Sequence, residues 1–206
     1  MLNQKSDDMK TIVKIFFLMA VISLAAGCSK TDDQISDESK SQPVTVTVPF
    51  EANLLGEITK LDSENPECKD EGYGYHAIVI ARGTATHMGL VSITLDFCTY
   101  GPDDPNIPGA DNKYASSSSE LVAANGDKLF LYIEGGSVID GRTDDHPDYV
   151  VDYWRDKIII TGGTGKFEGA SGELQTDDFN TNIDTYAHHH WYGEITLVKG
   201  KRETNM

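Results

Sequence analysis

Basic residues are scarce in this chain. Its 206 residues include 17 Lys and Arg against 33 Asp and Glu, which gives a formal net charge of −16 at pH 7. A protein that binds nucleic acid needs a basic face, and no Lys/Arg cluster occurs in the sequence. The composition therefore argues against a nucleic-acid partner.

Helical signals are also missing. No segment shows a convincing 3.6-residue hydrophobic period, and strand patterns do not alternate with helical ones. This argues against helix bundles and α/β folds. The length favours one domain or at most two small ones, and a hydrophobic content of 39% is low but sufficient for one core.

Long apolar runs are confined to the N-terminus. Residues 15–26 are apolar, follow Lys10 and Lys14, and end at Gly27-Cys28. Twelve residues of helix rise about 18 Å, which is short of the roughly 30 Å hydrocarbon core of a membrane. The pattern predicts an export signal rather than a membrane-spanning helix.

The end of this run, Leu-Ala-Ala-Gly-Cys at residues 24–28, resembles the bacterial lipobox. The resemblance implies that residues 1–27 are a lipoprotein signal peptide and that acyl chains such as palmitate on Cys28 hold the protein at a membrane. An ordinary signal peptide with a chance Cys is the alternative. Residues 28–43 lack aromatics and predict an acylated, flexible tether, which leaves 44–206 as the folded domain.

The resemblance also gives an expected location. Ser29 rather than Asp follows Cys28, which favours the outer membrane, with the domain facing the periplasm or the cell exterior. The choice between inner and outer membrane, the leaflet, and a start at Met1 or Met9 stay open.

Two cysteines remain once Cys28 is assigned to lipid. In an oxidising compartment, Cys68 and Cys98 form an even pair and predict a disulfide. A metal site or a catalytic thiol is the rival interpretation, but no His lies at ligand spacing from either cysteine.

From residue 44 onward, runs rich in Val, Ile, Thr and aromatics alternate with Gly, Pro, Asn and Asp clusters, which predicts antiparallel strands and turns. An eight-stranded barrel abolishes exposed sheet edges, whereas a two-sheet sandwich of the same strands must protect them. Residues 44–60 could be an extra strand or a plug, and 99–115 a long connection over a barrel end. The strands are expected near 44–49, 54–60, 73–86, 89–98, 116–124, 128–138, 149–161, 166–175 and 185–198.

The most distinctive string is Gly-Gly-Thr-Gly-Lys-Phe at residues 162–167. It is not a phosphate-binding P-loop, because Lys166 is followed by Phe167 rather than Ser or Thr. It is not a dinucleotide fingerprint either, because Glu168 stands where the third glycine is needed.

This string resembles the Gly-Gly-Thr-Gly-x-Phe motif of the dirigent and allene oxide cyclase-like barrels. The segments 83–89, 124–127 and 193–197 agree with bacterial members of that group. The resemblance implies an all-β, antiparallel, eight-stranded barrel of the calycin type. In it, Gly162, Gly163 and Gly165 form a tight turn, Phe167 enters the barrel, and Gly169 leaves room for neighbours.

A strand through residues 186–197 divides its side chains by parity. We expect His189 and Trp191 to point inward, where they are the candidate ligand-binding residues, although a structural His189 is the alternative. His188 and His190 then point outward, and no third ligand is spaced to complete a metal site. Asp144, Asp145, Asp148, Asp152 and Asp156, with His146, are interpreted as a charged surface, because the calcium-loop pattern is absent.

Three functions remain open. The barrel binds a small apolar ligand or a partner without catalysis, or it is an isomerase or cyclase acting on a hydrophobic substrate inside the barrel, or it is a structural or adhesive surface protein. No catalytic residue, metal or cofactor is predicted, and the oligomeric state stays open. The interior of the barrel distinguishes these functions, since an apolar cavity with one or two ionisable residues would favour the enzyme.

Overall fold

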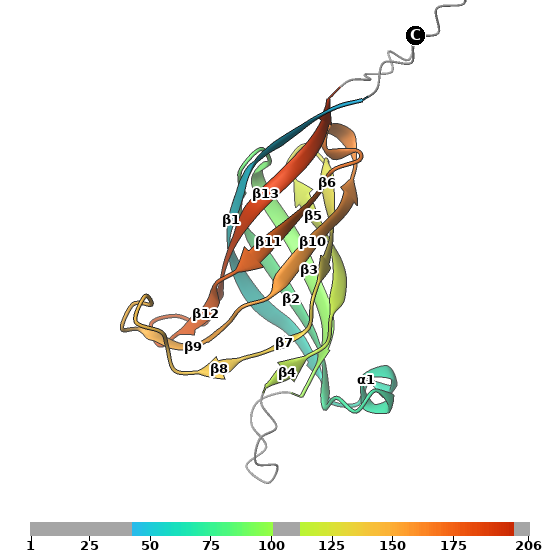
Figure 1. Ribbon diagram of the computed structural model, residues 1–206. Coiled ribbons are helices and arrows are strands. Elements are labelled where there is room, and N and C mark those ends of the chain that lie inside the picture. Colours follow the sequence, from blue (N-terminus) through green and yellow to red (C-terminus); the bar gives the residue numbers. More distant parts are fainter. Residues whose placement is uncertain (1–42, 101–111, 200–206) are drawn as a thin grey trace, which may run out of the picture. The chain divides into compact units, whose positions relative to one another are not determined.

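A computed structural model describes residues 43–100 and 112–199 (Figure 1). The predicted signal peptide, the acylation site at Cys28 and most of the tether lie outside the described residues, as does most of the 99–115 connection. Within the described ranges, no helix is long and apolar enough to cross a membrane.

Eight strands pair with their neighbours in a closed antiparallel ring. The first strand also pairs with the last, from Val44 opposite Lys199 to Gly56 opposite Ala187, and this pairing closes the barrel. The predicted eight-stranded antiparallel barrel is confirmed, and the sandwich alternative is wrong. In order around the ring, the strands are β1 (Val44–Asp62), β2 (Tyr75–Ala85), β3 (Gly89–Thr99), β5 (Ser117–Ala123), β6 (Lys128–Ile133), β10 (Lys157–Gly163), β11 (Ser171–Thr176) and β13 (Ala187–Lys199).

Alternating apolar residues fill the barrel. In β3, Val91, Ile93 and Leu95 are buried, while the polar residues between them face outward or lie half-buried. The same alternation in the other strands builds one continuous core, in which Phe50, Leu121, Leu129, Phe167 and Ile195 are fully buried. This core excludes water from the upper part of the barrel in Figure 1, where β1 begins and β13 ends.

The lower end of the barrel, where β1 ends and β13 begins, is built differently (Figure 1). Beyond Gly56, β1 pairs only with β2, because β13 starts at Ala187. From β13 the sheet continues into an outer ribbon of β12 (Asp178–Thr181), β9 (Val150–Trp154) and β8 (Ile139–Asp140). On the other side, β4 (Lys113–Tyr114) bridges β3 and β7 (Gly136–Ser137).

Three sequence expectations about the strands were wrong. Residues 44–60 belong to a strand, as one of the two alternatives had it, but it is one unbroken strand of the barrel wall rather than two strands or a plug, because it pairs with β13 and with β2. The 149–161 run is broken at residues 155–156, where the chain leaves the outer ribbon and enters the barrel wall. The predicted 166–175 strand starts only at Ser171, since a 3-10 helix (η1, Gly165–Phe167) comes first.

A short helix that the sequence reading missed carries the first disulfide cysteine. In α1 (Pro66–Asp70), the Asn65 side chain accepts a hydrogen bond from the Cys68 N–H, and Pro66 occupies the first turn. The helix places Cys68 opposite Cys98 of β3, with their Cα atoms 5.3 Å apart, and the two form a disulfide. The predicted disulfide is confirmed.

The glycine string ends β10, where Gly162 and Gly163 still pair with β6, and from Thr164 onward it forms the connection to β11. Gly165 has a φ of 60° and Gly169 one of 71°, conformations that favour glycine. Thr164 accepts a hydrogen bond from the Lys128 N–H, which ties the connection to the start of β6. The turn folds the Phe167 ring completely into the core.

Candidate ligand-binding site

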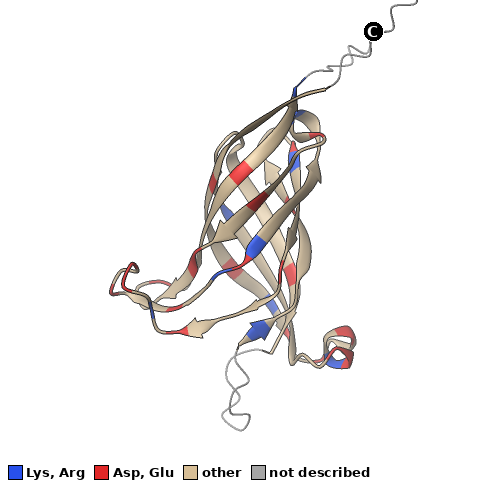
Figure 2. Cartoon of the chain, viewed as in Figure 1, with Lys and Arg blue, Asp and Glu red and all other residues tan. Residues whose placement is uncertain are grey.

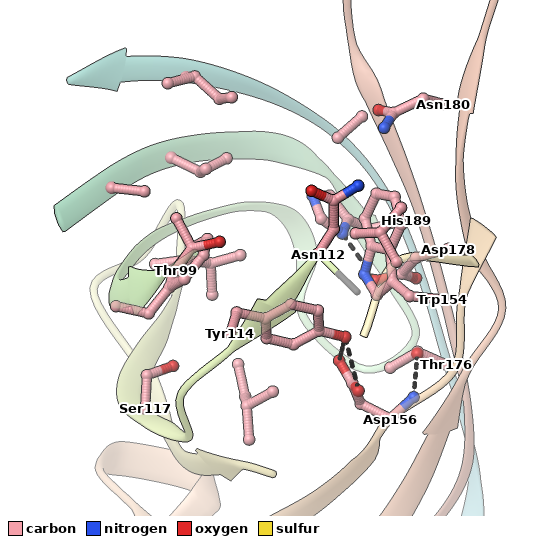
Figure 3. A pocket seen from close by; sticks show the side chains of 18 of the residues that line it. Thr99, Asn112, Tyr114, Ser117, Trp154, Asp156, Thr176, Asp178, Asn180 and His189 are labelled. Atoms are coloured by element: carbon pink, nitrogen blue, oxygen red, sulfur yellow. Dashed lines mark hydrogen bonds and ion pairs between the residues drawn. The ribbon is translucent and has the colours of Figure 1, made fainter. Parts of the chain in front are cut away.

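A cavity of about 420 Å³ occupies the lower end of the barrel, below the packed core. Most of its lining is apolar, from β1, β2, β3, β6 and β10. The polar lining residues that Figure 3 labels are Thr99, Asn112, Tyr114, Ser117, Trp154, Asp156, Thr176, Asp178, Asn180 and His189. An apolar cavity with a few polar groups is the usual form of a small-molecule site.

Asp178 is the centre of one polar cluster in this lining. One oxygen of its buried carboxylate accepts hydrogen bonds from His189 Nδ1 at 2.8 Å and from Trp191 Nε1 at 3.2 Å. The other oxygen accepts from the His190 backbone N–H at 3.0 Å. Three donors satisfy the carboxylate inside the barrel, and the contact fixes the orientation of both rings.

The bond to Asp178 leaves one nitrogen of His189 unused. Nε2 is buried and has no hydrogen-bond partner among the described residues. It lies over Gly56 of β1, where an added Cβ would come within 2.6 Å of it. Gly56 therefore makes room for the imidazole. Since Nδ1 donates to Asp178, Nε2 of the neutral ring is a free acceptor.

Asp156 and Tyr114 form a second polar pair. The Tyr114 hydroxyl lies 2.8 Å from both carboxylate oxygens of Asp156, as Figure 3 shows. Burial, with a smaller contribution from the negative charge of Asp178, raises the pKa of Asp156 to about 6. Burial also raises the pKa of Tyr114, which keeps the phenol protonated as a donor.

The strand pairing explains why Asp156 occupies this place. Its backbone N–H donates to Thr176 Oγ1 at 2.8 Å, and its carbonyl accepts from the Thr176 N–H at 3.0 Å. These two bonds join the β9–β10 break to the end of β11, so the carboxylate is held at the cavity wall by the backbone.

Asp152 is the third carboxylate of the lining. It accepts a hydrogen bond of 2.7 Å from Asn180 on the adjacent strand β12. Burial, opposed by this hydrogen bond and assisted by the charge of Asp140, raises its pKa above the ordinary value.

The sequence-predicted site residues fall in two places. His189 and Trp191 are buried, point inward and line the cavity. Gly162, Gly163, Gly165, Phe167 and Gly169 belong to the packed end of the barrel and are not part of the lining. His188 lies on the opposite side of β13, stacked on Phe179 and paired with Asp184.

One expectation about the site was wrong. The acidic run with His146 is not a purely charged surface, because Asp152 and Asp156 line the cavity and the imidazole of His146 is buried. His146 lies against the rings of Tyr153 and Phe179 and contacts Asp177. The exposed acidic residues of this run are Asp144, Asp145 and Asp148, on either side of His146.

A parity signal could have identified the missed residues. Asp152, Trp154 and Asp156 share even positions with the buried residues Ile158 and Ile160 that follow them. Asp178 likewise shares even positions with the buried Leu174 and Thr176. Tyr114 carried no such signal, since its two-residue strand is placed by tertiary pairing.

Within the described residues, no group of three His, Cys, Asp or Glu side chains is arranged to hold a metal ion. The polar side chains of the cavity instead form hydrogen bonds with one another, as Tyr114 does with Asp156 and as His189 and Trp191 do with Asp178.

No protein-family model matches this chain, and no curated protein matches it. Among solved structures, it is similar to the pterocarpan synthase dirigent protein GePTS1, with a TM-score of 0.45 and 12% identity over 78% of this chain and 90% of that one. It is also similar to the pterocarpan synthase dirigent protein PsPTS1, with a TM-score of 0.41 and 12% identity over 76% of this chain and 97% of that one. The strand pairing by itself makes the chain a closed, antiparallel, eight-stranded barrel, and dirigent proteins are among the structures to which it is similar.

Proposed function

We propose that the barrel binds a small, largely apolar molecule in its lower cavity. The observation that carries the proposal is the contrast between the two ends of the barrel. The upper part is filled by its own side chains, whereas the lower part encloses about 420 Å³. An eight-stranded barrel can either be filled or hold one small ligand, and the volume lies in the range of small-molecule sites.

The walls of the cavity support this choice of ligand. The cavity is lined from four strands of the ring, β2, β3, β6 and β10, by Val79, Leu95, Phe97, Ile133 and Ile158. Apolar surface gains about 25 cal/mol per Å² when it leaves water, so such walls favour an apolar body. Ile58 and Leu61, exposed at the end of β1, extend the apolar lining to the rim.

Catalysis is the second candidate, and a specific observation favours it. Two ionisable groups, Asp156 and His189, line the same apolar cavity. A carboxyl with a pKa of about 6 can donate a proton near neutral pH, and the imidazole held by Asp178 is a base whose Nε2 would have to turn away from Gly56 to meet a substrate. Proton removal at one atom and proton delivery at another is the chemistry of an isomerase or cyclase.

Intrinsic fluorescence tests the binding proposal. Trp154 and Trp191 both line the cavity, so either indole should report an occupant when a library of lipids and phenols is screened. Ala187→Leu narrows the cavity and should weaken the binding of every compound found in the screen. Tyr192→Leu changes an exposed side chain of the same strand and should leave that binding unchanged. A folded protein whose two indoles respond to no compound would overturn the proposal.

The same hits separate binding from catalysis. Each hit is incubated with the protein and analysed by chromatography for an isomer of unchanged mass. Turnover that is lost in Asp156→Asn and His189→Ala, with binding retained, would establish the enzyme. Binding without any isomer, over the whole set of hits, would leave the non-catalytic function.

We also propose, from the lipobox resemblance, that the protein is an exported lipoprotein anchored through Cys28. The binding domain would then act at a membrane surface.

A further inference from the structure

We infer that the molecule held in the cavity carries a protonated amine. This inference rests on the proposed binding function and adds to it the charge of the ligand. It starts from the carboxylates and the imidazole of the lining, which are Asp152, Asp156, Asp178 and His189, without any Lys or Arg among the described lining residues.

The three carboxylates are hydrogen-bonded, but their negative charge is not offset by a strong base. Asp156 accepts from a phenol and Asp152 from an amide, and both of these donors are neutral. Asp178 accepts from an indole, a backbone N–H and His189. Neutral hydrogen bonds lower the cost of burying a charge without removing the charge itself.

The two basic residues that flank Asp156 in the chain are engaged elsewhere. Arg155 donates to Asp177 at 2.6 Å, and Lys157 pairs with Glu173 at 2.9 Å. Figure 2 shows acidic residues spread over many strands and loops rather than gathered in one place. The described lining of the cavity thus contains carboxylates and no Lys or Arg. The net charge of the chain, −16, also repels anions.

Aromatic rings add to the attraction for a cation. Phe97, Tyr114, Trp154 and Trp191 line the cavity from four different strands. The faces of such rings carry negative charge density, and a cation placed over them is attracted, most strongly where water is excluded.

Two acceptors beside the cavity have no hydrogen-bond partner within the described part of the chain. His189 is more than nine-tenths buried, and its Nε2 has no hydrogen-bond partner among the described residues. Asn112 Oδ1, also in the lining, has none either. Both atoms are covered by protein, with Nε2 packed against Gly56, so the ligand meets the carboxylates and the aromatic rings of the lining rather than these two acceptors. A primary ammonium offers three donors, whereas a carboxylate offers none and would face three like charges.

Three probes with the same phenylpropyl body test the inference. They are 3-phenylpropylamine, 3-phenylpropan-1-ol and 3-phenylpropanoate, titrated at pH 7.5 by calorimetry and by tryptophan fluorescence. We expect the amine to bind at least about tenfold more tightly than the alcohol, and the propanoate not to bind.

Charge-removing variants localise the effect. Asp156→Asn and Asp152→Asn should each reduce the preference for the amine over the alcohol by about three- to tenfold, with the alcohol little changed. Glu194→Gln is the matched control, because Glu194 is an exposed carboxylate on β13 and its removal should leave the preference intact. Asp178 is avoided here because its loss would also free the rings of His189 and Trp191.

The outcomes separate this inference from the function on which it rests. If the alcohol binds as tightly as the amine, or if the propanoate binds best, the inference of a protonated amine is refuted. The proposed binding function is then unaffected. Equal losses of preference in Glu194→Gln and Asp156→Asn would also overturn the inference, since the effect would then come from overall charge. A protein that binds none of the three probes and no compound of the lipid and phenol library would refute both the binding function and the inference of a protonated amine.

Discussion

Asp178 and His189 lie 2.8 Å apart on neighbouring strands, with the carboxylate of Asp178 also accepting from the Trp191 indole. Both side chains are almost completely buried. One carboxylate thus holds the two residues that the sequence pattern alone placed inside the barrel. The contact joins the outer ribbon to the barrel wall at the cavity.

Replacement of Asp178 tests this contact. Asp178→Asn keeps the shape but turns one acceptor into a donor, which faces an N–H that also donates. We expect a loss of about 1–3 kcal/mol in the free energy of unfolding, measured by urea titration, because one buried hydrogen bond is lost. Asp145→Asn, on an exposed turn, is the control. Equal stability of wild type and Asp178→Asn would contradict the role assigned to the carboxylate.

Gly56 is predicted to be required for the position of His189. The Cβ of Gly56→Ala would lie 2.6 Å from Nε2 and should destabilise the protein by about 1–3 kcal/mol through overpacking. His189→Ala should relieve this cost in the double variant, so the two effects would not add. Additive losses in a double-mutant cycle of unfolding free energies would show that the residues are independent.

The pH dependence of stability should contain a signature of Asp156. Its pKa is raised to about 6 from 3.8, mainly by burial, so the folded protein holds this proton more tightly than the unfolded chain does. The contribution of the group is therefore fully present below about pH 4 and is lost as the pH rises through 6, by roughly 2–3 kcal/mol. Urea titrations at pH 4 and 7 should show Asp156→Asn gaining stability relative to wild type at the higher pH. A constant difference would refute the raised pKa.

The disulfide is predicted to stabilise the fold by restricting the unfolded chain. Its cysteines are 30 residues apart, which corresponds to about 3–4 kcal/mol in the loop-entropy estimate. Cys68→Ala, Cys98→Ala and the double variant should all lose about this amount in urea titrations, with the double variant no worse than the singles. A double variant as stable as the wild type would show that the bridge contributes nothing.

Acylation at Cys28 is tested by metabolic labelling. A tagged fatty acid should label the wild-type protein and fail to label Cys28→Ala, which should also leave the membrane fraction. Ser29→Ala, one residue further on, should be labelled as the wild type is. Labelling of Cys28→Ala, or a wild-type product that stays in the supernatant, would refute the lipoprotein proposal.

The sequence predicted what depends on local alternation. In residues 89–98 and 187–197, period two identified the strands, and parity placed His189 and Trp191 inside. The pairing of 44–56 with 187–199 could not be predicted this way, because it joins residues far apart in the chain. For that reason the sequence left residues 44–60 as either an extra strand or a plug.

The cavity could not be predicted from local sequence patterns. Its polar lining meets only where the outer ribbon folds back on the barrel, so Asp178 and Asp156 come together from separate strands. Acidic residues in a turn-rich stretch are usually exposed, and that general tendency concealed the two that are buried. Tertiary pairing at Tyr114 and Thr176 overrode it.

The seam between β1 and β13 makes the two ends of the domain depend on each other. Thirteen residue pairs join the first strand to the last, so the ring cannot close until the final strand has been synthesised. Until then, a chain made from its N-terminus would be an open sheet. The edge of β1 that later pairs with β13 would have no partner strand. Such a domain cannot mature gradually during synthesis, and its assembly becomes a single late event governed by one long-range contact.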